Sequence, residues 1–324
     1  VGVALGAQHA AHHHLRLGKA FGEHVHERDG AALADVAHAC AKVRVGRVVE
    51  RDATTLVGRD VVDDLVVCGA EPLFMTDYIA VGKVIPERIA EIVKGIAIGA
   101  EKAGVALVGG ETAEHPGLLE EDEFDIAGAA TGAVDADKLL GADRVRKGDV
   151  ILAMPASGIH ANGYSLVRHI LATQKISLDT HVAELGKTIG ESLLTPTEIY
   201  SLDCLTLYKA MQDSLRGYVH ITGGGIAENT VRVLPDHLMA TYDRSTWALP
   251  AEMEYLAQIG KVPQADMERT WNAGIGMSAI LAPEDADRAL RSLSARGMKA
   301  WIAGVIGERT GSTGAALVGT YQLR

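Results

Sequence analysis

Three aspartates near position 60 have the type and spacing of a cation site. Asp60 and Asp64 stand four residues apart, and Asp63 is adjacent. On a helix Asp60 and Asp64 share a face, where like charges repel each other. A bound Mg²⁺ would reverse that repulsion, because hard cations seek carboxylate oxygens. The alternative explanation of the pattern is a solvated helix face.

A glycine pair follows the apolar run 105–108, which is typical of a short strand. Gly109 and Gly110 are followed directly by Glu111 and Thr112. Glycines at a strand end let a ligand approach the backbone, and the acidic residue could hold a metal. A tight turn with surface acids explains the same residues.

The segment 157–165 places a hydroxyl, an imidazole and an amide in a glycine-flanked turn before an expected helix. Its polar residues are Ser157, His160, Asn162 and Ser165. Unpaired amides and the helix dipole at such a helix start favour an anion, and His160 could donate to phosphate or shuttle a proton. In the alternative, Asn162 caps the helix and His160 lies on the surface.

A second glycine segment lies between an expected strand and helix. Thr222 precedes Gly223, Gly224 and Gly225, and Asn229 follows in the helix. Three glycines leave their amides unshielded, which favours a phosphate cradle. A flexible loop is the alternative. The sequence contains neither the P-loop pattern nor the dinucleotide-binding glycine pattern after a strand.

Histidine and charge are unevenly distributed. Seven of the 13 histidines lie before residue 39, but the run at 12–14 has no predicted fold around it, so we interpret it as incidental. The net charge of −11 disfavours nucleic-acid binding. The three cysteines lack a Cys-x-x-Cys spacing, no apolar run approaches a membrane span of ~20 residues, and no signal peptide is evident, so we expect a soluble cytoplasmic protein.

From residue 61 onward, strand-like runs alternate with helical periodicity, which predicts an α/β or α+β protein in two halves. Pro86 and Gly104 predict the ends of one helix. The expected strands are 73–84, 105–108, 124–134, 149–154, 218–222, 274–281, 300–306 and 315–321. The other expected helices end near 68, begin near 162, span 196–214 and 227–234, and run from 283 to 297. Residues 1–60 show no clear strand alternation.

Taken in order, several segments resemble the phosphoribosylformylglycinamidine cyclo-ligase family, also called AIR synthetase, of purine biosynthesis. The resemblance covers about residue 61 to residue 324. It rests on segments 63–74, 77–83, 109–117, 157–166, 221–225 with Asn229, and 271–277. The departures are small: Ala156 and Ala161 stand where the family usually has Ser, and Trp271 and Ala273 replace its Phe and Met.

The resemblance implies a reaction and a fold. The family uses ATP, with Mg²⁺, to phosphorylate the amide oxygen of formylglycinamidine ribonucleotide, after which the amidine nitrogen closes the imidazole ring. It also implies a mixed-sheet N-terminal domain that pairs into a homodimer and a C-terminal α/β domain.

The resemblance further implies roles for residues of this sequence. Asp64 and Glu111 would bind metal and nucleotide together with Gly109, Gly110 and Thr112, and Lys83 would neutralise phosphate charge. The substrate side would comprise Ser157, His160, Asn162, Ser165, Thr222, Gly223, Gly224, Gly225 and Asn229. His160, Asp64 and Lys83 are the expected catalytic residues.

Residues 1–60 are expected to lie outside the resemblance. The family's glycine-rich ATP segment, with Asp-Gly-Val-Gly-Thr-Lys, has no counterpart there; Asp29 and Gly30 begin a segment that lacks the second glycine, the Thr and the Lys. A shifted reading frame or misplaced start, and a divergent segment, both explain this. We therefore expect domains at 61–146 and 147–324. The alternative functions are another ATP-using superfamily member, such as a thiamine-monophosphate kinase or selenophosphate synthetase, and an inactive relative.

Overall fold

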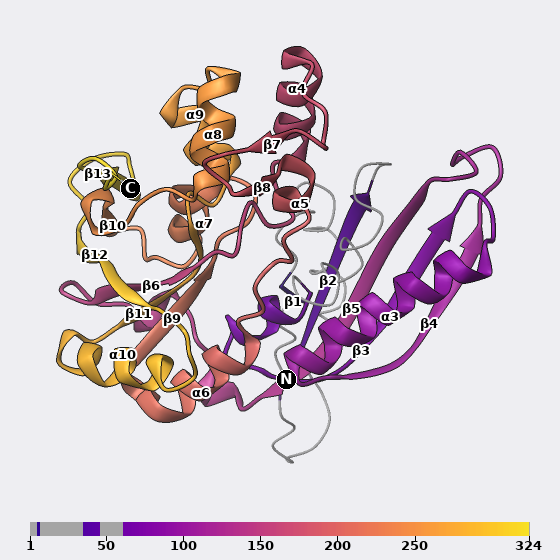
Figure 1. Ribbon diagram of the computed structural model, residues 1–324. Helices are drawn as coiled ribbons and strands as arrows, with labels where there is room; N and C mark the ends of the chain where they lie inside the picture. The colour runs from indigo at the N-terminus through magenta and orange to yellow at the C-terminus, as the bar shows by residue number, and fades with distance from the viewer. Residues whose placement is uncertain (1–4, 7–34, 46–60, 324) are drawn as a thin grey trace, which may run out of the picture. The chain divides into compact units, whose positions relative to one another are not determined.

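The computed structural model describes residues 5–6, 35–45 and 61–323 (Figure 1). The chain divides into an N-terminal unit, Val1–Leu139 with Ile199–Leu205, and a C-terminal unit, Leu140–Glu198 with Thr206–Arg324. Asp60, the histidines at 12–14 and the segment 29–32 lie outside the described residues. The mixed α/β class agrees with the prediction, and no helix in the described part of the chain is long and apolar enough to cross a membrane.

A five-stranded mixed sheet forms the N-terminal unit, in the order β1-β2-β5-β3-β4. β5 pairs antiparallel with β2 and with β3, whereas β4 pairs parallel with β3. The strands are β1 (Leu5–Gly6), β2 (Asp35–Val45), β3 (Glu71–Val81), β4 (Ala106–Glu114) and β5 (Phe124–Val134).

The strand β2 was not expected from the sequence. It pairs residue by residue with β5, from Asp35 opposite Val134 to Val45 opposite Phe124. Within the segment 35–45, Ala and Val at odd positions from 37 to 45 alternate with mostly polar residues, a short period-2 pattern that the surrounding Ala-, His- and Arg-rich sequence obscures.

The helix α3 (Pro86–Ala103) begins and ends as predicted. Pro86 occupies the first turn, where its missing N–H costs nothing, and Gly104 ends the helix with a left-handed φ of 74°. Its buried stripe includes Ile92 and Ile96, and α3 runs alongside β3 and β4 (Figure 1). This packing leaves alternate side chains of β3 directed to the opposite face of the sheet.

A six-stranded sheet forms the centre of the C-terminal unit. Its order is β13-β10-β12-β6-β11-β9. All seven residues of β11 are buried, as expected for a strand with neighbours on both sides. The strands are β6 (Val150–Pro155), β9 (Leu215–His220), β10 (Leu238–Asp243), β11 (Ile275–Leu281), β12 (Trp301–Glu308) and β13 (Ala315–Val318).

Helices gather beyond one edge of this sheet, where α4, α8 and α9 lie near one another in Figure 1. Val167 and Ile170 of α4 pack with Met253 and Leu256 of α8 and with Trp271 in one buried cluster. The helices from residue 164 onward are α4 (Tyr164–Gln174), α5 (Ile189–Leu193), α6 (Ser201–Met211), which begins in the N-terminal unit, α7 (Gly225–Val231), α8 (Ala251–Gly260), α9 (Gln264–Thr270) and α10 (Ala286–Ser294). The sequence pattern alone does not predict α8, α9 or β10.

Close approach of α9 to α7 depends on one glycine. Gly225 has a left-handed φ of 68°, and a Cβ atom built on it would lie 1.7 Å from the carbonyl oxygen of Glu268. The same atom would lie 3.3 Å from the carbonyl oxygen of Trp271. Only glycine therefore satisfies both the backbone conformation and the contact.

We predict that Gly225→Ala destabilises the C-terminal unit by about 2–4 kcal/mol, because it combines left-handed strain with a backbone clash. The matched control is Gly217→Ala in β9, where an added Cβ meets nothing within 4 Å and φ is not left-handed. That control is expected to be neutral, or to stabilise by up to about 1 kcal/mol. Urea unfolding midpoints measure both effects, and equal midpoints would contradict the packing described here.

Candidate active site

Two of the predicted ligand loops leave the six-stranded sheet at the same edge. β6 leads into residues 157–163, and β9 leads into residues 221–225. β11 lies between these strands and runs antiparallel to both, so its first residues lie where theirs end. Hydrogen bonds continue past the strands, from Ala156 N to Gly274 O (2.9 Å) and from Ile221 N to Gly276 O (3.0 Å). The segment 271–276 thus lies between the two loops, and its main chain is hydrogen-bonded to the start of each.

His160 is buried in the first loop in a strained conformation. Its side chain and backbone are together only 5% exposed, and its φ of 64° lies in the left-handed region. That region costs a residue other than glycine roughly 1–2 kcal/mol. The ring nitrogen Nε2 accepts a hydrogen bond from the Ser157 backbone N–H at 3.1 Å. Because Nε2 is an acceptor, the ring is neutral and carries its proton on Nδ1. The alternative that His160 lies on the surface is wrong.

The other polar residues of this loop surround the start of α4. Ser157 Oγ donates to the Pro196 carbonyl at 2.6 Å, Asn162 is half-buried, and Ser165 is exposed in the first helical turn. Gly163, with φ of 90°, is the residue before the helix, and no side chain caps it. The alternative in which Asn162 caps α4 is therefore wrong. Uncapped first-turn amides are the groups that bind anions at helix starts.

The buried side chain of Asn229 holds the glycine loop 222–225 in place through hydrogen bonds. This residue is 0% exposed, and its Nδ2 donates to the carbonyls of Gly225 at 2.7 Å and of Thr222 and Gly223 at 3.3 Å. Its Oδ1 accepts from Thr222 Oγ1 at 3.2 Å. This geometry does not favour the predicted contact between Asn229 and substrate, because the amide of Asn229 is used to position the loop. The half-buried Gly223 and Gly224 remain the residues that a ligand can reach.

Packing of α9 beside this loop is secured by an ionic cluster. Arg244 Nε and an Nη donate to the two carboxylate oxygens of Glu268 at 2.8 and 2.9 Å, and the Tyr321 hydroxyl donates to Glu268 at 2.8 Å. Burial alone would raise the pKa of Glu268, but the hydrogen bonds from Arg244, Gln264 and Tyr321 lower it overall. Burial, followed by the charge of Glu268, raises the pKa of Tyr321, so this hydroxyl stays a donor.

In the N-terminal unit, residues 61–66 form the predicted helix and carry two buried carboxylates. Asp63 is 1% exposed and Asp64 8%, so the solvated-face alternative is wrong. Asp63 accepts the Tyr200 backbone N–H at 3.1 Å and thus has a structural role. Burial and then the charge of Asp64 raise the pKa of Cys68, whose Sγ lies 3.9 Å from the Asp64 carbonyl.

The first glycine pair lies inside a strand, so the expected strand end at residue 108 and the alternative of a tight turn are both wrong. Gly109, Gly110, Glu111 and Thr112 continue β4 and pair with residues 76–79 of β3. A Cβ on Gly110 would lie 2.2 Å from Oδ1 of Asp77, so the glycine makes room for a carboxylate from the neighbouring strand. Burial raises the pKa of that carboxylate. Glu111 is exposed on this edge strand, and Thr112 is half-buried.

The predicted cationic and metal-binding residues belong to separate elements. Lys83 pairs with Glu121 at 3.0 Å on the surface, a contact that contributes little to stability and is readily exchanged. Asp64 and Glu111 lie on the helix 61–66 and on β4. The described residues bring together no group of three or more His, Cys, Asp or Glu side chains able to hold a metal.

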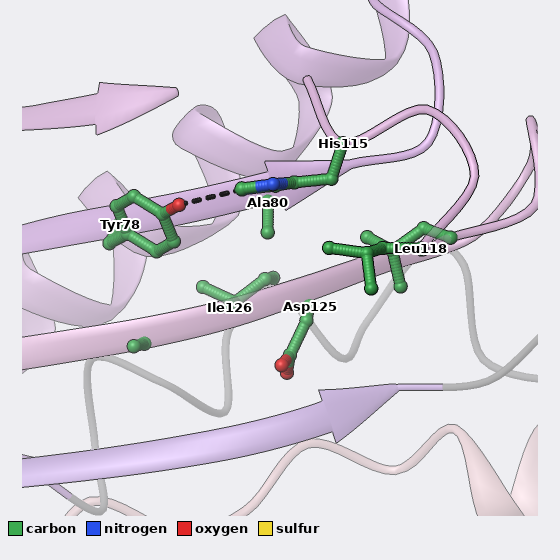
Figure 2. Close-up of a pocket in the computed structure, with 8 residues that line it drawn as sticks. Tyr78, Ala80, His115, Leu118, Asp125 and Ile126 are labelled. Atoms are coloured by element: carbon green, nitrogen blue, oxygen red, sulfur yellow. Dashed lines mark hydrogen bonds between the residues drawn. The ribbon is translucent and has the colours of Figure 1, made fainter. Parts of the chain in front are cut away.

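A cavity of about 330 Å³ in the N-terminal unit was not predicted from the sequence. Figure 2 shows His115 directed toward Tyr78, whose hydroxyl lies 2.9 Å from His115 Nε2. Leu118 and the buried Asp125 contribute to its lining. The volume is at the lower end of the range of ligand pockets, and the walls combine an aromatic ring, aliphatic groups and a carboxylate. The one sequence signal is Asp125, a charged residue in an otherwise apolar strand.

Comparison with known proteins identifies two matching domain families. The model described as AIR synthase related protein, N-terminal domain, matches residues 23–134, and the C-terminal domain of the same description matches residues 146–316. The first match begins at residue 23, so the family pattern reaches into the segment that the sequence analysis expects to lie outside it.

Relatives named phosphoribosylformylglycinamidine cyclo-ligase match most of the chain. The Pseudothermotoga lettingae protein is 42% identical over 269 residues, covering 82% of this chain and 78% of the relative. The Desulfitobacterium hafniense protein is 46% identical over 254 residues, covering 77% and 74%.

Solved structures with low sequence identity share the fold. The hydrogenase maturation protein HypE in complex with ATP aligns with a TM-score of 0.67 at 17% identity, covering 91% of this chain and 85% of that chain. Thiamine-monophosphate kinase from Stenotrophomonas maltophilia aligns with a TM-score of 0.64 at 17% identity, covering 91% and 88%.

The Glu268 cluster predicts a pH-dependent stability. Because its folded pKa is lowered, the stabilisation is present above the unfolded value of about 4.3 and disappears as pH falls through the folded pKa. Glu268→Gln should therefore cost about 1–3 kcal/mol at pH 7, and the difference from the parent should shrink below about pH 4. Urea unfolding across pH measures this. Glu308→Gln, which removes only an exposed pair with Lys147, is the control and should change little; an equal effect of both substitutions would refute the prediction.

Proposed function

Because this chain belongs to the AIR synthase related protein family, we propose that it is a phosphoribosylformylglycinamidine cyclo-ligase. Identity of 42% or more to relatives of that name, over at least 77% of the chain, is the observation that carries the proposal. The substrate is a small molecule, formylglycinamidine ribonucleotide, and the reaction consumes ATP to form a C–N bond in purine biosynthesis.

The proposed reaction balances in two steps. The amide oxygen of the substrate takes the γ-phosphoryl group of ATP, and ADP leaves. The amidine nitrogen then attacks the activated carbon, phosphate departs with the former amide oxygen, and loss of a proton leaves aminoimidazole ribonucleotide. Phosphorylation is needed because an amide oxygen is otherwise a poor leaving group.

We assign the substrate side to the loops at the edge of the six-stranded sheet. The exposed first turn of α4 and the amides of Gly223 and Gly224 offer backbone donors for phosphate oxygens. The neutral ring of His160, with its proton on Nδ1, suits a donor to an oxygen that gains negative charge. Ser157, Asn162, Ser165 and Thr222 complete the polar lining that we propose, with Asn229 holding the glycine loop in shape.

We assign the nucleotide side to the N-terminal unit. Asp64 and Glu111 carry the oxygen ligands that Mg²⁺ prefers, and Gly109, Gly110 and Thr112 flank Glu111 on the same strand. Magnesium commonly binds through one or two carboxylates plus substrate phosphates, so two side chains suffice without a preformed cage. When bound, Mg²⁺ would neutralise part of the phosphate charge, and the positive charge of Lys83 would neutralise more of it. A cytoplasmic location remains a prediction of the sequence.

A homodimer is the proposed assembly, formed through the sheet face opposite α3. Phe74 and Tyr78 alternate along β3 with the fully buried Met75 and Ile79, so they lie on the other face, where they are 40% and 39% exposed. Large apolar side chains grouped on one face favour burial against another protein surface. A second copy is the proposed occupant, because the family that the sequence resembles pairs through this domain.

The assay that tests the function measures ATP-dependent formation of aminoimidazole ribonucleotide. Asp64→Asn and His160→Ala are each expected to lower kcat/KM by at least about a hundredfold, because each removes a group that contacts charge in the transition state. Glu101→Gln, an exposed carboxylate of α3, is the control and should retain parent activity. No product from the parent chain would reject the enzyme and favour an inactive relative. Parent-like rates in both variants would reject the site.

Sedimentation tests the dimer. The parent chain should sediment at twice the chain mass at micromolar concentration, and Phe74→Asp should shift it to a monomer because a charge would be buried at the interface. Val318→Asp on β13 is matched in exposure, 44% against 40%, and should leave the dimer intact. A monomeric parent, or a dimeric Phe74→Asp variant, would contradict the proposed face.

A further inference from the structure

We propose that Asn272 is a positioning residue for the reaction, acting through the backbone that carries His160. The inference rests on the proposed function, because it assigns a role to the His160 loop in that reaction. Asn272 itself is 4% exposed, and both atoms of its side-chain amide bond to main-chain groups, so we assign it no direct contact with substrate.

The side-chain amide of Asn272 bridges two segments. Its Nδ2 donates to the carbonyl oxygens of Gly158 at 2.9 Å and Ile159 at 3.2 Å. Its Oδ1 accepts the backbone N–H of Gly274 at 2.8 Å. The two acceptors are the last carbonyls before His160. The amide of Asn272 therefore fixes the orientation of the two peptide groups that precede the strained His160.

Both sides of this bridge are conformationally unusual. Ala273 has a φ of 50° and Gly274 a φ of 93°, opposite the left-handed His160 at 64°. Trp271 Nε1 also donates to the Gly163 carbonyl at 3.3 Å, at the far end of the loop. The loop is therefore held before and after His160 by neighbouring residues of one segment, and a left-handed residue other than glycine persists only where its surroundings fix it.

Sheet topology explains why this segment is available. The pairing of β6 with β11 places Ile275 opposite Pro155, and the bond from Ala156 N to Gly274 O extends the ladder by a further step. The next residues cannot continue the ladder, because loop 157–163 turns toward α4. The amide of Asn272 takes over as donor where backbone pairing ends.

The donor function can be separated from shape with an isosteric change. Asn272→Asp keeps the size of the side chain but replaces the N–H donors by an oxygen facing two carbonyls. If Asn272 acts by filling space, this variant behaves like the parent. If it acts by holding the loop, the loss of donors moves His160, and a displacement of a reacting group by about 1 Å can cost on the order of a hundredfold in rate.

A double-mutant cycle with His160→Ala is the test. We expect Asn272→Asp to lower kcat between about tenfold and a hundredfold in the parent background and less than about twofold when His160 is already Ala, because only coupled residues are non-additive. Ser214→Ala, which removes a hydrogen bond to Asp285 at the opposite end of β9, is the structural control and should have equal, small effects in both backgrounds. Equal losses in the two backgrounds for Asn272→Asp, or a parent-like kcat, would overturn the proposal.

Histidine ring NMR keeps the test independent of turnover. The signal of His160, assigned as the one missing in His160→Ala, should shift in Asn272→Asp and not in Ser214→Ala. Trp271→Phe, which removes the bond to Gly163 and part of a buried ring but leaves the bonds of Asn272 in place, should shift it less and serves if Asn272→Asp does not fold. An unshifted signal overturns the positioning role even in an active enzyme. A shifted signal in a chain that forms no product supports the role and rejects the proposed function instead.

Discussion

Antiparallel pairing of β11 with both β6 and β9 is the constraint on which the C-terminal unit depends. Because strands of opposite direction alternate here, two loops leaving β6 and β9 and the segment entering β11 meet at one edge of the sheet. Backbone hydrogen bonds continue beyond the strand ends, at Ala156 and Ile221, so the first residues of both loops are held in the same strand arrangement. Segments far apart in the sequence thereby become neighbours at the ends of these strands.

Beyond the ladder, two buried asparagine amides replace backbone partners. Asn229 fixes the glycine loop and Asn272 fixes the loop of His160. Both donate to main-chain carbonyls, whereas the oxygen of Asn229 accepts from the Thr222 hydroxyl and that of Asn272 accepts from the backbone N–H of Gly274. A buried carbonyl without a donor would cost about 1–3 kcal/mol, so each amide stabilises a shape that the loop sequence alone would not keep. Preorganised loops of this kind hold donors where negative charge develops, which is how phosphoryl transfer is assisted.

Local signals in the sequence predict much of the fold, and non-local contacts explain the misses. Pro86 and Gly104 mark α3 because proline and glycine act within one helical turn. The strand expected to end at residue 108 instead continues through Gly109 and Gly110, since β3 supplies the hydrogen bonds and Asp77 fills the space beside Gly110. The Asn229 side chain points toward the glycine loop because α7 is buried on that side. No feature of the neighbouring sequence predicts this orientation. The loops were recognisable from their residue types, whereas their meeting at one edge required the strand order.

Amide hydrogen exchange with and without aminoimidazole ribonucleotide tests whether the substrate binds between these two loops, because it reports protection at each backbone position. We predict slower exchange in both 157–166 and 222–226 when the nucleotide is added, with α10 unchanged as an internal control. Protection confined to only one of the two loops, or absent from both while the nucleotide binds elsewhere, would contradict the placement of the substrate between them.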